Sequence, residues 1–71
     1  NPAHGHVNLE ILGHKMASVS LLDESGRTLQ TWNVQGSTRL DVSAWSEGTY
    51  VLIVNMGEGE PLRRRLVLLR N

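Results

Sequence analysis

The chain of 71 residues contains no cysteine and no phenylalanine, and its aromatic residues are two tryptophans and one tyrosine. The lack of cysteine excludes disulfide bonds and thiolate metal sites. The longest apolar runs, residues 51–54 and 66–69, are far shorter than the roughly 20 residues that cross a bilayer as a helix. We therefore expect a domain without membrane insertion that is stabilised by packing and backbone hydrogen bonds alone.

The chain also lacks an excess of charge of either sign, since it has seven Lys and Arg residues against seven Asp and Glu residues. This balance argues against a nucleic-acid partner, because proteins that bind nucleic acid present a broad basic face. The charges are nevertheless unevenly placed: residues 61–71 hold four arginines and no acid, and residues 1–60 hold all seven acids. Outward charge that keeps an edge strand soluble is a sufficient structural explanation of the basic end.

The hydrophobic pattern predicts strands and no helix. At this length the chain is one domain, residues 1–71, with a thin core that buries only roughly 60% of the unfolded surface. Apolar and polar residues alternate with the period of a half-buried strand, and turn residues recur at intervals of about eight to twelve residues. The expected strands are 7–12, 17–22, 27–34, 38–42, 50–54 and 62–69. They predict an all-β, immunoglobulin-like or fibronectin III-like antiparallel sandwich of six to seven strands.

Local features refine this fold. Residues 23–26 suit a type I turn followed by a left-handed glycine, and loop 43–48 suits a compact turn or one turn of 3₁₀ helix. Leu29 and Trp32 differ in parity, so both face the core only if a bulge lies near Gln30 or Thr31. Tyr50 follows Gly48 at the start of a strand that is apolar on both faces. We expect that strand to be central and the Tyr50 hydroxyl to bond to backbone just upstream.

No set of residues predicts catalysis, a metal or a cofactor. His4, His6 and His14 are the candidate metal ligands, but no carboxylate or cysteine is fixed beside them by spacing. Residues 23–26 lack the later ligands of a calcium loop. None of the serines has the surroundings of a nucleophile, and the few aromatic residues are needed by the core, which disfavours a sugar-binding platform. We therefore expect a protein that is not an enzyme.

The arginines at 63–65 are the one cluster that packing alone does not explain. Consecutive side chains of a strand alternate between its faces, so three in a row place at least one arginine on the side that should pack. Either the strand lies at an edge, or its charge has a function.

Four motifs follow one another along the chain. They are Asn1-Pro2-Ala3-x-Gly5-x-Val7; Val19-x-Leu21-Leu22-Asp23-x-x-Gly26-Arg27; Leu40-Asp41-Val42-Ser43 followed by Gly48-Thr49-Tyr50-Val51-Leu52; and Arg64-Arg65-Leu66-Val67-Leu68-Leu69. In this order they resemble the type A C-terminal sorting domain of cargo proteins of the type IX (Por) secretion system in Bacteroidetes-type Gram-negative bacteria. The chain departs from the family pattern where arginine replaces the commoner lysine near the end and where Trp45 replaces leucine.

The resemblance implies a non-catalytic, immunoglobulin-like secretion signal for a passenger protein that precedes it. Such a domain is recognised by the outer-membrane translocon and its shuttle and sortase proteins. It passes through the periplasm and takes the passenger to the cell surface or the medium, often being removed when the passenger is anchored. The motif residues of the fold are Asn1, Pro2, Gly5, Asp23, Gly26, Asp41, Gly48 and Tyr50. The implied recognition residues are Arg63, Arg64, Arg65, Leu66, Val67, Leu68, Leu69 and Arg70.

Two further expectations remain open. An exposed edge at the last strand would allow a strand-swapped homodimer. The alternative function is a non-catalytic, fibronectin-like binding or spacer module of a secreted surface enzyme. A sorting signal has to end the polypeptide, whereas a spacer works at any position, so position separates the two functions.

Overall fold

A computed structural model describes residues 2–3, 5–11, 16–57 and 59–69. These residues form strands joined by turns and contain no helix. The strands are β1 (Pro2–Ala3), β2 (His6–Leu9), β3 (Met16–Leu22), β4 (Thr28–Gln35), β5 (Thr38–Asp41), β6 (Gly48–Asn55) and β7 (Leu62–Leu68). The predicted all-β class is confirmed.

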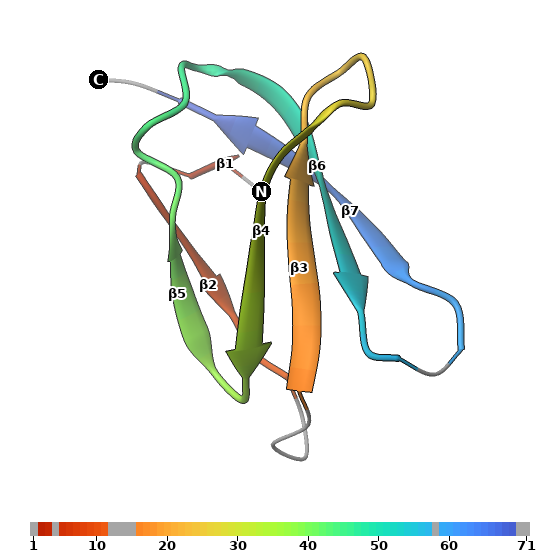
Figure 1. Cartoon of the computed structure of the whole chain (residues 1–71). Helices are drawn as coiled ribbons and strands as arrows, with labels where there is room; N and C mark the ends of the chain where they lie inside the picture. Colours follow the sequence, from red (N-terminus) through yellow and green to blue (C-terminus); the bar gives the residue numbers. More distant parts are fainter. Residues whose placement is uncertain (1, 4, 12–15, 58, 70–71) are drawn as a thin grey trace.

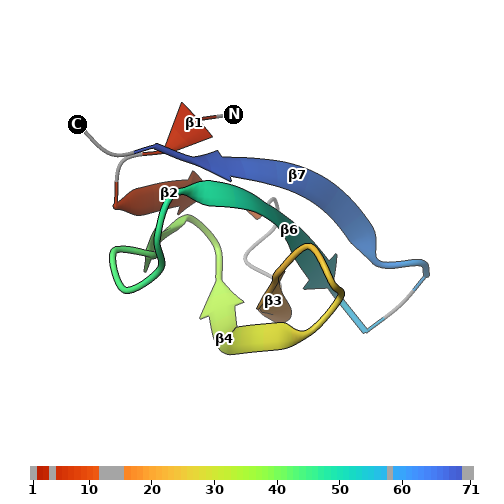
Figure 2. The ribbon, with the colours of Figure 1, turned by 90° about the horizontal axis from the view of Figure 1, so that it is seen from above.

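The strands form two layers (Figure 1). The larger sheet has the order β1-β7-β6-β3-β4, and the smaller sheet consists of β2 and β5. All pairs are antiparallel except β1 with β7. Seen from above, the larger sheet curves strongly from β7 round to β4 (Figure 2). With β3, β4, β6 and β7 as strands C, C′, F and G, and β2 and β5 as B and E, this is the immunoglobulin arrangement.

The core lies between the two layers and is built by strict alternation. In β3, Ala17, Val19 and Leu21 are buried, while Ser18 and Ser20 face outward as predicted. The other core side chains come mainly from β4, β5, β6 and β7; they are Ile11, Val34, Leu40, Val42, Tyr50, Leu52, Val54, Leu66 and Leu68. β6 is the middle strand of its sheet, which confirms its predicted central place.

A bulge in β4 reconciles its two large apolar residues. Leu21 pairs with Gln30 and Leu22 with Thr28, so Leu29 is the extra residue opposite β3. This insertion changes the parity of the strand, and Leu29 and Trp32 both pack against the core. The predicted bulge exists, one residue earlier than the expected Gln30 or Thr31.

Three details refine or correct the sequence-based expectation. The strand expected at 7–12 is β2, His6–Leu9, and Ile11 is buried beyond its end. Loop 43–47 forms the expected compact turn, with a 3.2 Å bond from the Trp45 amide to the Val42 carbonyl, and not the alternative turn of 3₁₀ helix. β1 was not expected at all, because a segment of two residues is too short to show a period of two.

Candidate functional site

The last strand, β7, is held by its second half. Leu66 and Leu68 are only 4% and 3% exposed, and their backbones pair with Tyr50 and Gly48 of β6. Val67, between them, points to the outer face and is half-buried, and Leu69 is 41% exposed. The buried leucines therefore fix the strand, and the side chains around them remain accessible.

The first half of β7 extends beyond the cover of the small sheet. Leu62 and Arg64 have the same parity as the buried Leu66, yet Leu62 is 46% exposed and Arg64 is exposed too. Figure 1 shows the reason: β7 begins on the right, far from β2 and β5 on the left. Three consecutive arginines are therefore tolerated because, among the described residues, no layer lies opposite the inner face of this part of the strand.

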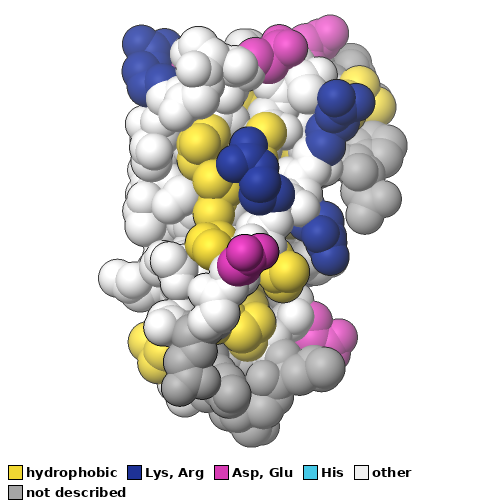
Figure 3. All heavy atoms as spheres, turned by 90° about the vertical axis from the view of Figure 1, so that its right-hand side faces the viewer, with side chains coloured by type: hydrophobic (Ala, Val, Ile, Leu, Met, Phe, Trp, Pro, Cys, Tyr) yellow, Lys and Arg dark blue, Asp and Glu magenta, His cyan; other side chains and the backbone are white. Residues whose placement is uncertain are grey.

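The three arginine side chains do not share one face of the strand. Arg63 and Arg65 pair with Ile53 and Val51 and face outward, whereas Arg64 has the opposite parity and donates from Nη1 to the Arg63 carbonyl at 2.9 Å. Figure 3 shows this side of the molecule, with hydrophobic side chains in the middle and Lys and Arg side chains among them. In the described part of the chain the one ion pair is Arg27 with Asp23, so the three arginines have no carboxylate partner there.

The N-terminal segment lies at the same edge as the tail. β1 runs parallel to the end of β7, with Pro2 opposite Val67 and Ala3 opposite Leu68. Just after β1, the Gly5 carbonyl accepts a 2.9 Å bond from the Val42 amide, which ties the segment to the end of β5. Both ends of the described chain therefore meet at β7, a juxtaposition that sequence spacing could not reveal.

The described motif residues gather at one end of the sandwich, where β3, β5 and β7 end and β2 and β6 begin. The register shows this directly, because His6 lies opposite Asp41, Leu22 opposite Val51, and Gly48 opposite Leu68. Arg63 lies nearer the other end, opposite Ile53. Arg65, in contrast, lies opposite Val51, next to Tyr50, so the structure separates Arg63 but not Arg65 from the motif residues. Asn1 and Arg70 lie outside the described residues.

Tyr50 forms the predicted corner. Its hydroxyl donates to the Ser46 carbonyl at 2.6 Å while its ring is buried in the core. A hydrogen bond of this kind contributes about 1 kcal/mol to stability. Gly48, at the start of the strand, has φ +155°, a conformation that side-chain-bearing residues rarely adopt, and the Tyr50 ring lies 3.7 Å from where a Cβ would stand. The two-residue spacing between Gly48 and Tyr50 in the motif is therefore explained by the geometry of this corner.

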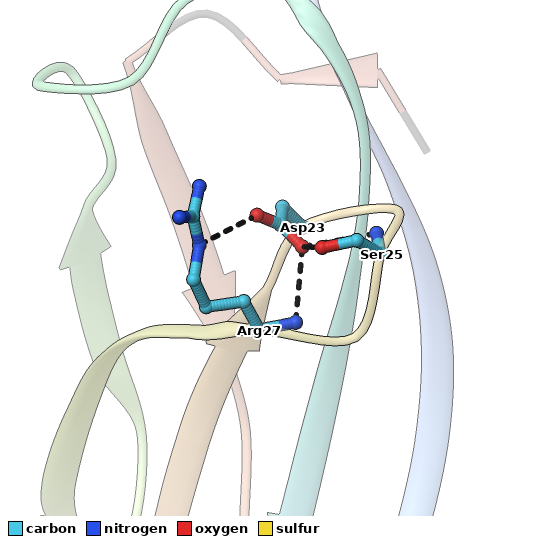
Figure 4. Close-up of polar contacts among 3 residues, drawn as sticks. All are labelled: Asp23, Ser25 and Arg27. Atoms are coloured by element: carbon cyan, nitrogen blue, oxygen red, sulfur yellow. Dashed lines mark hydrogen bonds and ion pairs between the residues drawn. The ribbon is translucent and has the colours of Figure 1, made fainter.

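Asp23 organises the turn between β3 and β4 (Figure 4). Its Oδ1 accepts bonds from the Ser25 amide at 3.0 Å, the Ser25 hydroxyl at 2.7 Å and the Arg27 amide at 3.0 Å. Its Oδ2 accepts a 3.1 Å bond from Nε of Arg27. The Gly26 amide donates to the Asp23 carbonyl, and Gly26 has φ +93°, so the predicted hydrogen-bonded turn with a left-handed glycine is present.

The end of β5 repeats this chemistry. Oδ1 of Asp41 accepts bonds from the Ser43 amide at 3.0 Å and the Ser43 hydroxyl at 2.6 Å. The Ser43 hydroxyl and amide lower the pKa of Asp41, as the Ser25 hydroxyl, followed by the Arg27 amide, lowers the pKa of Asp23 to about 2. Hydrogen bonds to the charged form favour it, and these two motif aspartates therefore act as turn-forming acceptors.

The lowered pKa of Asp23 predicts a pH dependence of stability. The folded-state pKa lies below the ordinary 3.8, so its contribution is complete above about pH 4 and is lost as pH falls towards 2. We expect the free energy of unfolding, measured with urea at a series of pH values, to decline over that window. Asp23→Asn should flatten the decline, while Glu24→Gln, in the same turn, should leave it unchanged. Identical acid profiles for wild type and Asp23→Asn would contradict the assignment.

The remaining candidate residues show no second site. Trp32 and Trp45 pack edge to face, with ring centroids 6.1 Å apart, against the core. His4 and His14 lie outside the described residues, and within the described ranges no three His, Cys, Asp or Glu side chains are grouped to hold a metal ion. The part of the chain that the structure covers also contains no helix long and apolar enough to cross a membrane.

Comparison with known proteins gives one match. Residues 1–68 match the model of the family described as the secretion system C-terminal sorting domain. No curated protein and no solved structure matches the chain. The matched region contains the first three motifs, the fourth as far as Leu68, and every described strand of the sandwich.

Proposed function

Because this chain belongs to the family of secretion system C-terminal sorting domains, which indicates a sorting signal for type IX secretion, we propose that residues 1–71 are one such signal at the end of a cargo protein. The family is not catalytic, and its signal implies export across the outer membrane to the cell surface or the medium. The observation that carries the proposal is the family match over residues 1–68.

In this proposal the folded domain presents β7 to the secretion apparatus. The exposed Arg63, Arg64, Arg65 and Leu69 are the side chains that a receptor touches, and guanidinium groups bind carboxylates with strong, bidentate bonds. Leu66 and Leu68 act by holding the strand in place, since their side chains are buried. Val67 contributes from the outer face, and Arg70 continues the basic segment.

The proposed partners are the outer-membrane translocon and its shuttle and sortase proteins, met during transit through the periplasm. The passenger precedes Asn1, and removal of the domain would cut upstream of that residue. Since β1 pairs with the end of β7, the junction to the passenger lies beside the recognised strand. One protein that binds this edge would therefore reach both the signal and the junction.

The open edge of β7 also offers backbone pairing. Among the described strands, β1 covers this edge only at Val67 and Leu68. Residues 62–66 can therefore pair with a strand of a receptor or, in the isolated domain, of a second copy. Light scattering that finds only monomers over a wide concentration range would exclude the strand-swapped homodimer.

Moving the domain tests the sorting function. We expect a periplasmic reporter with this domain at its C-terminus to reach the surface or medium of a bacterium that has a type IX system. The same reporter with the domain placed between two folded modules should stay in the periplasm. Cell fractionation and protease accessibility measure the difference. Equal export from both positions would favour the alternative, a fibronectin-like spacer of a secreted enzyme.

A further inference from the structure

The outer face of the larger sheet carries side chains in ordered cross-strand rows. In one row Arg65 of β7 lies beside Val51 of β6, which lies beside Leu22 of β3. In the next row Arg63 lies beside Ile53, with Ser20 following. The face therefore has a basic column on β7 directly next to an apolar column on β6.

The apolar column has no cover from the described parts of the chain. Val51 and Ile53 are half-buried by their neighbours, as are Leu22 and Val67 at their flanks, and the small sheet of β2 and β5 packs against the opposite face. A surface hollow of about 340 Å³ opens beside Ile53 and Arg63 and is completed by Glu60 and Pro61. Figure 3 shows hydrophobic and basic side chains intermingled on this side of the molecule, with an acidic side chain beside them.

Within its strands, this face carries charge of one sign only. The outward positions of its four long strands carry no acid, and their only charged side chains are Arg63 and Arg65. The remaining outward positions are Met16, Ser18, Ser20, Leu22, Thr28, Thr31, Asn33, Gln35, Thr49, Val51, Ile53, Asn55 and Val67. Glu60 lies in the loop before β7, at the rim of the hollow. In a chain of zero net charge, such a face is complementary to an acidic partner.

Other occupants fit less well. A second copy docked by the same face about a two-fold axis would bring arginines against arginines, which is repulsive. A lipid surface is recognised by clusters of about four to eight basic residues, and this face has two. The arginines could also simply keep the apolar column soluble by covering it with their aliphatic segments. That role needs a positive charge but no planar guanidinium group, so lysine would serve equally well.

We propose that this face docks an acidic and apolar protein surface of the type IX apparatus. Its carboxylates pair with Arg63 and Arg65, and its apolar side chains cover Val51 and Ile53 and enter the hollow beside them. The proposal rests on the proposed sorting function and adds the chemistry of the partner. It differs from recognition of the tail, because it uses the sheet face and the centre of β6 and does not involve Arg64 or Leu69.

The test uses a reporter that ends in the whole domain, expressed in a type IX-competent bacterium. A photo-crosslinking amino acid, p-benzoylphenylalanine, is placed at Ile53 or, as a control, at the exposed Arg39 of the small sheet. We expect the probe at Ile53 to form a product with an apparatus protein and the probe at Arg39 not to do so. Arg63→Glu with Arg65→Glu should lower that product and the export roughly tenfold, the effect of losing interface anchor residues.

Two variants act as matched controls. Arg39→Glu reverses a charge on the opposite sheet and should leave export and the crosslink unchanged. Arg63→Lys with Arg65→Lys keeps the charge and removes the planar guanidinium groups. Its export and its Ile53 crosslink should therefore lie between those of wild type and the glutamate variant. Full export and crosslinking by the glutamate variant would overturn the proposal. If protease sensitivity shows that the glutamate variant does not fold, the proposal is tested by the crosslink of the Ile53 probe in the otherwise unchanged domain.

The outcomes separate the two hypotheses. If the unmodified reporter is not exported, the sorting function itself is wrong. If it is exported but the Ile53 probe gives no protein product, the sorting function stands and the docking face is wrong. Products with lipopolysaccharide or with a second copy of the chain would likewise overturn the choice of partner.

Discussion

We expect a passenger fused to this domain to remain in the periplasm when residues 66–71 are deleted. The deletion removes the end of the proposed recognition strand together with two core side chains, Leu66 and Leu68. It also removes the partners of β1, since Pro2 and Ala3 pair with Val67 and Leu68. We expect surface display of the passenger to be lost, as measured by fractionation and by protease treatment of whole cells. Normal surface display of the truncated protein would contradict the proposal that this strand carries the signal.

A second variant separates lost recognition from lost folding. Arg64→Ser with Leu69→Ser changes only exposed side chains and leaves the core intact. We expect the purified domain to keep its β-sheet circular dichroism while export falls. Leu66→Ala with Leu68→Ala, in contrast, keeps the exposed tail but empties the core beneath it. If export is lost in the Leu66→Ala, Leu68→Ala variant but not in the Arg64→Ser, Leu69→Ser variant, the apparatus recognises the folded shape and not the tail side chains.

Leu21→Ala is expected to unfold the isolated domain. Leu21 is completely buried, and its β-sheet neighbour on β6 is Leu52, also in the core. Truncation of a buried leucine to alanine costs about 2–5 kcal/mol, because transfer energy is lost and a cavity remains. A core of this size rarely supplies more than about 3–5 kcal/mol of net stability. The loss is therefore comparable to the whole free energy of unfolding, and urea titration at 25 °C should find little or no folded protein.

Leu62→Ala is the matched control for this substitution. It makes the same chemical change in a residue that is 46% exposed, at the start of β7. Changes at exposed positions usually alter stability by less than about 0.5 kcal/mol. The two variants should therefore differ by several kcal/mol although the same atoms are removed. A cooperative Leu21→Ala transition near the wild-type midpoint would mean that the core is not organised around β3.

Much of the sandwich could be predicted because its signals are local. The alternation around Val19 and Leu21 placed one face of β3 in the core, and the order Asp23 to Gly26 specified the following turn. Gly48 and Tyr50 indicated the corner, which the Tyr50 hydroxyl closes on Ser46. Each of these depends on residues a few positions apart, whose spacing reflects strand or turn geometry directly.

The candidate site was less predictable because its properties depend on distant segments. The parity of Arg63 to Arg65 showed that they point to opposite faces, but not which face is covered. The pairing of Pro2 with Val67 left no periodic signal, since β1 has only two residues.

By itself, the sequence determined the strands other than β1, the buried face of β3, the turns, the corner and the family to which the chain belongs. Only the tertiary structure decided that β1 and the end of β7 share one edge, that Leu66 and Leu68 are core residues, and that Arg63 and Arg65 flank an uncovered apolar column. The physical reason is that alternation fixes the direction of each side chain within its own strand, whereas exposure depends on which other layer reaches that point.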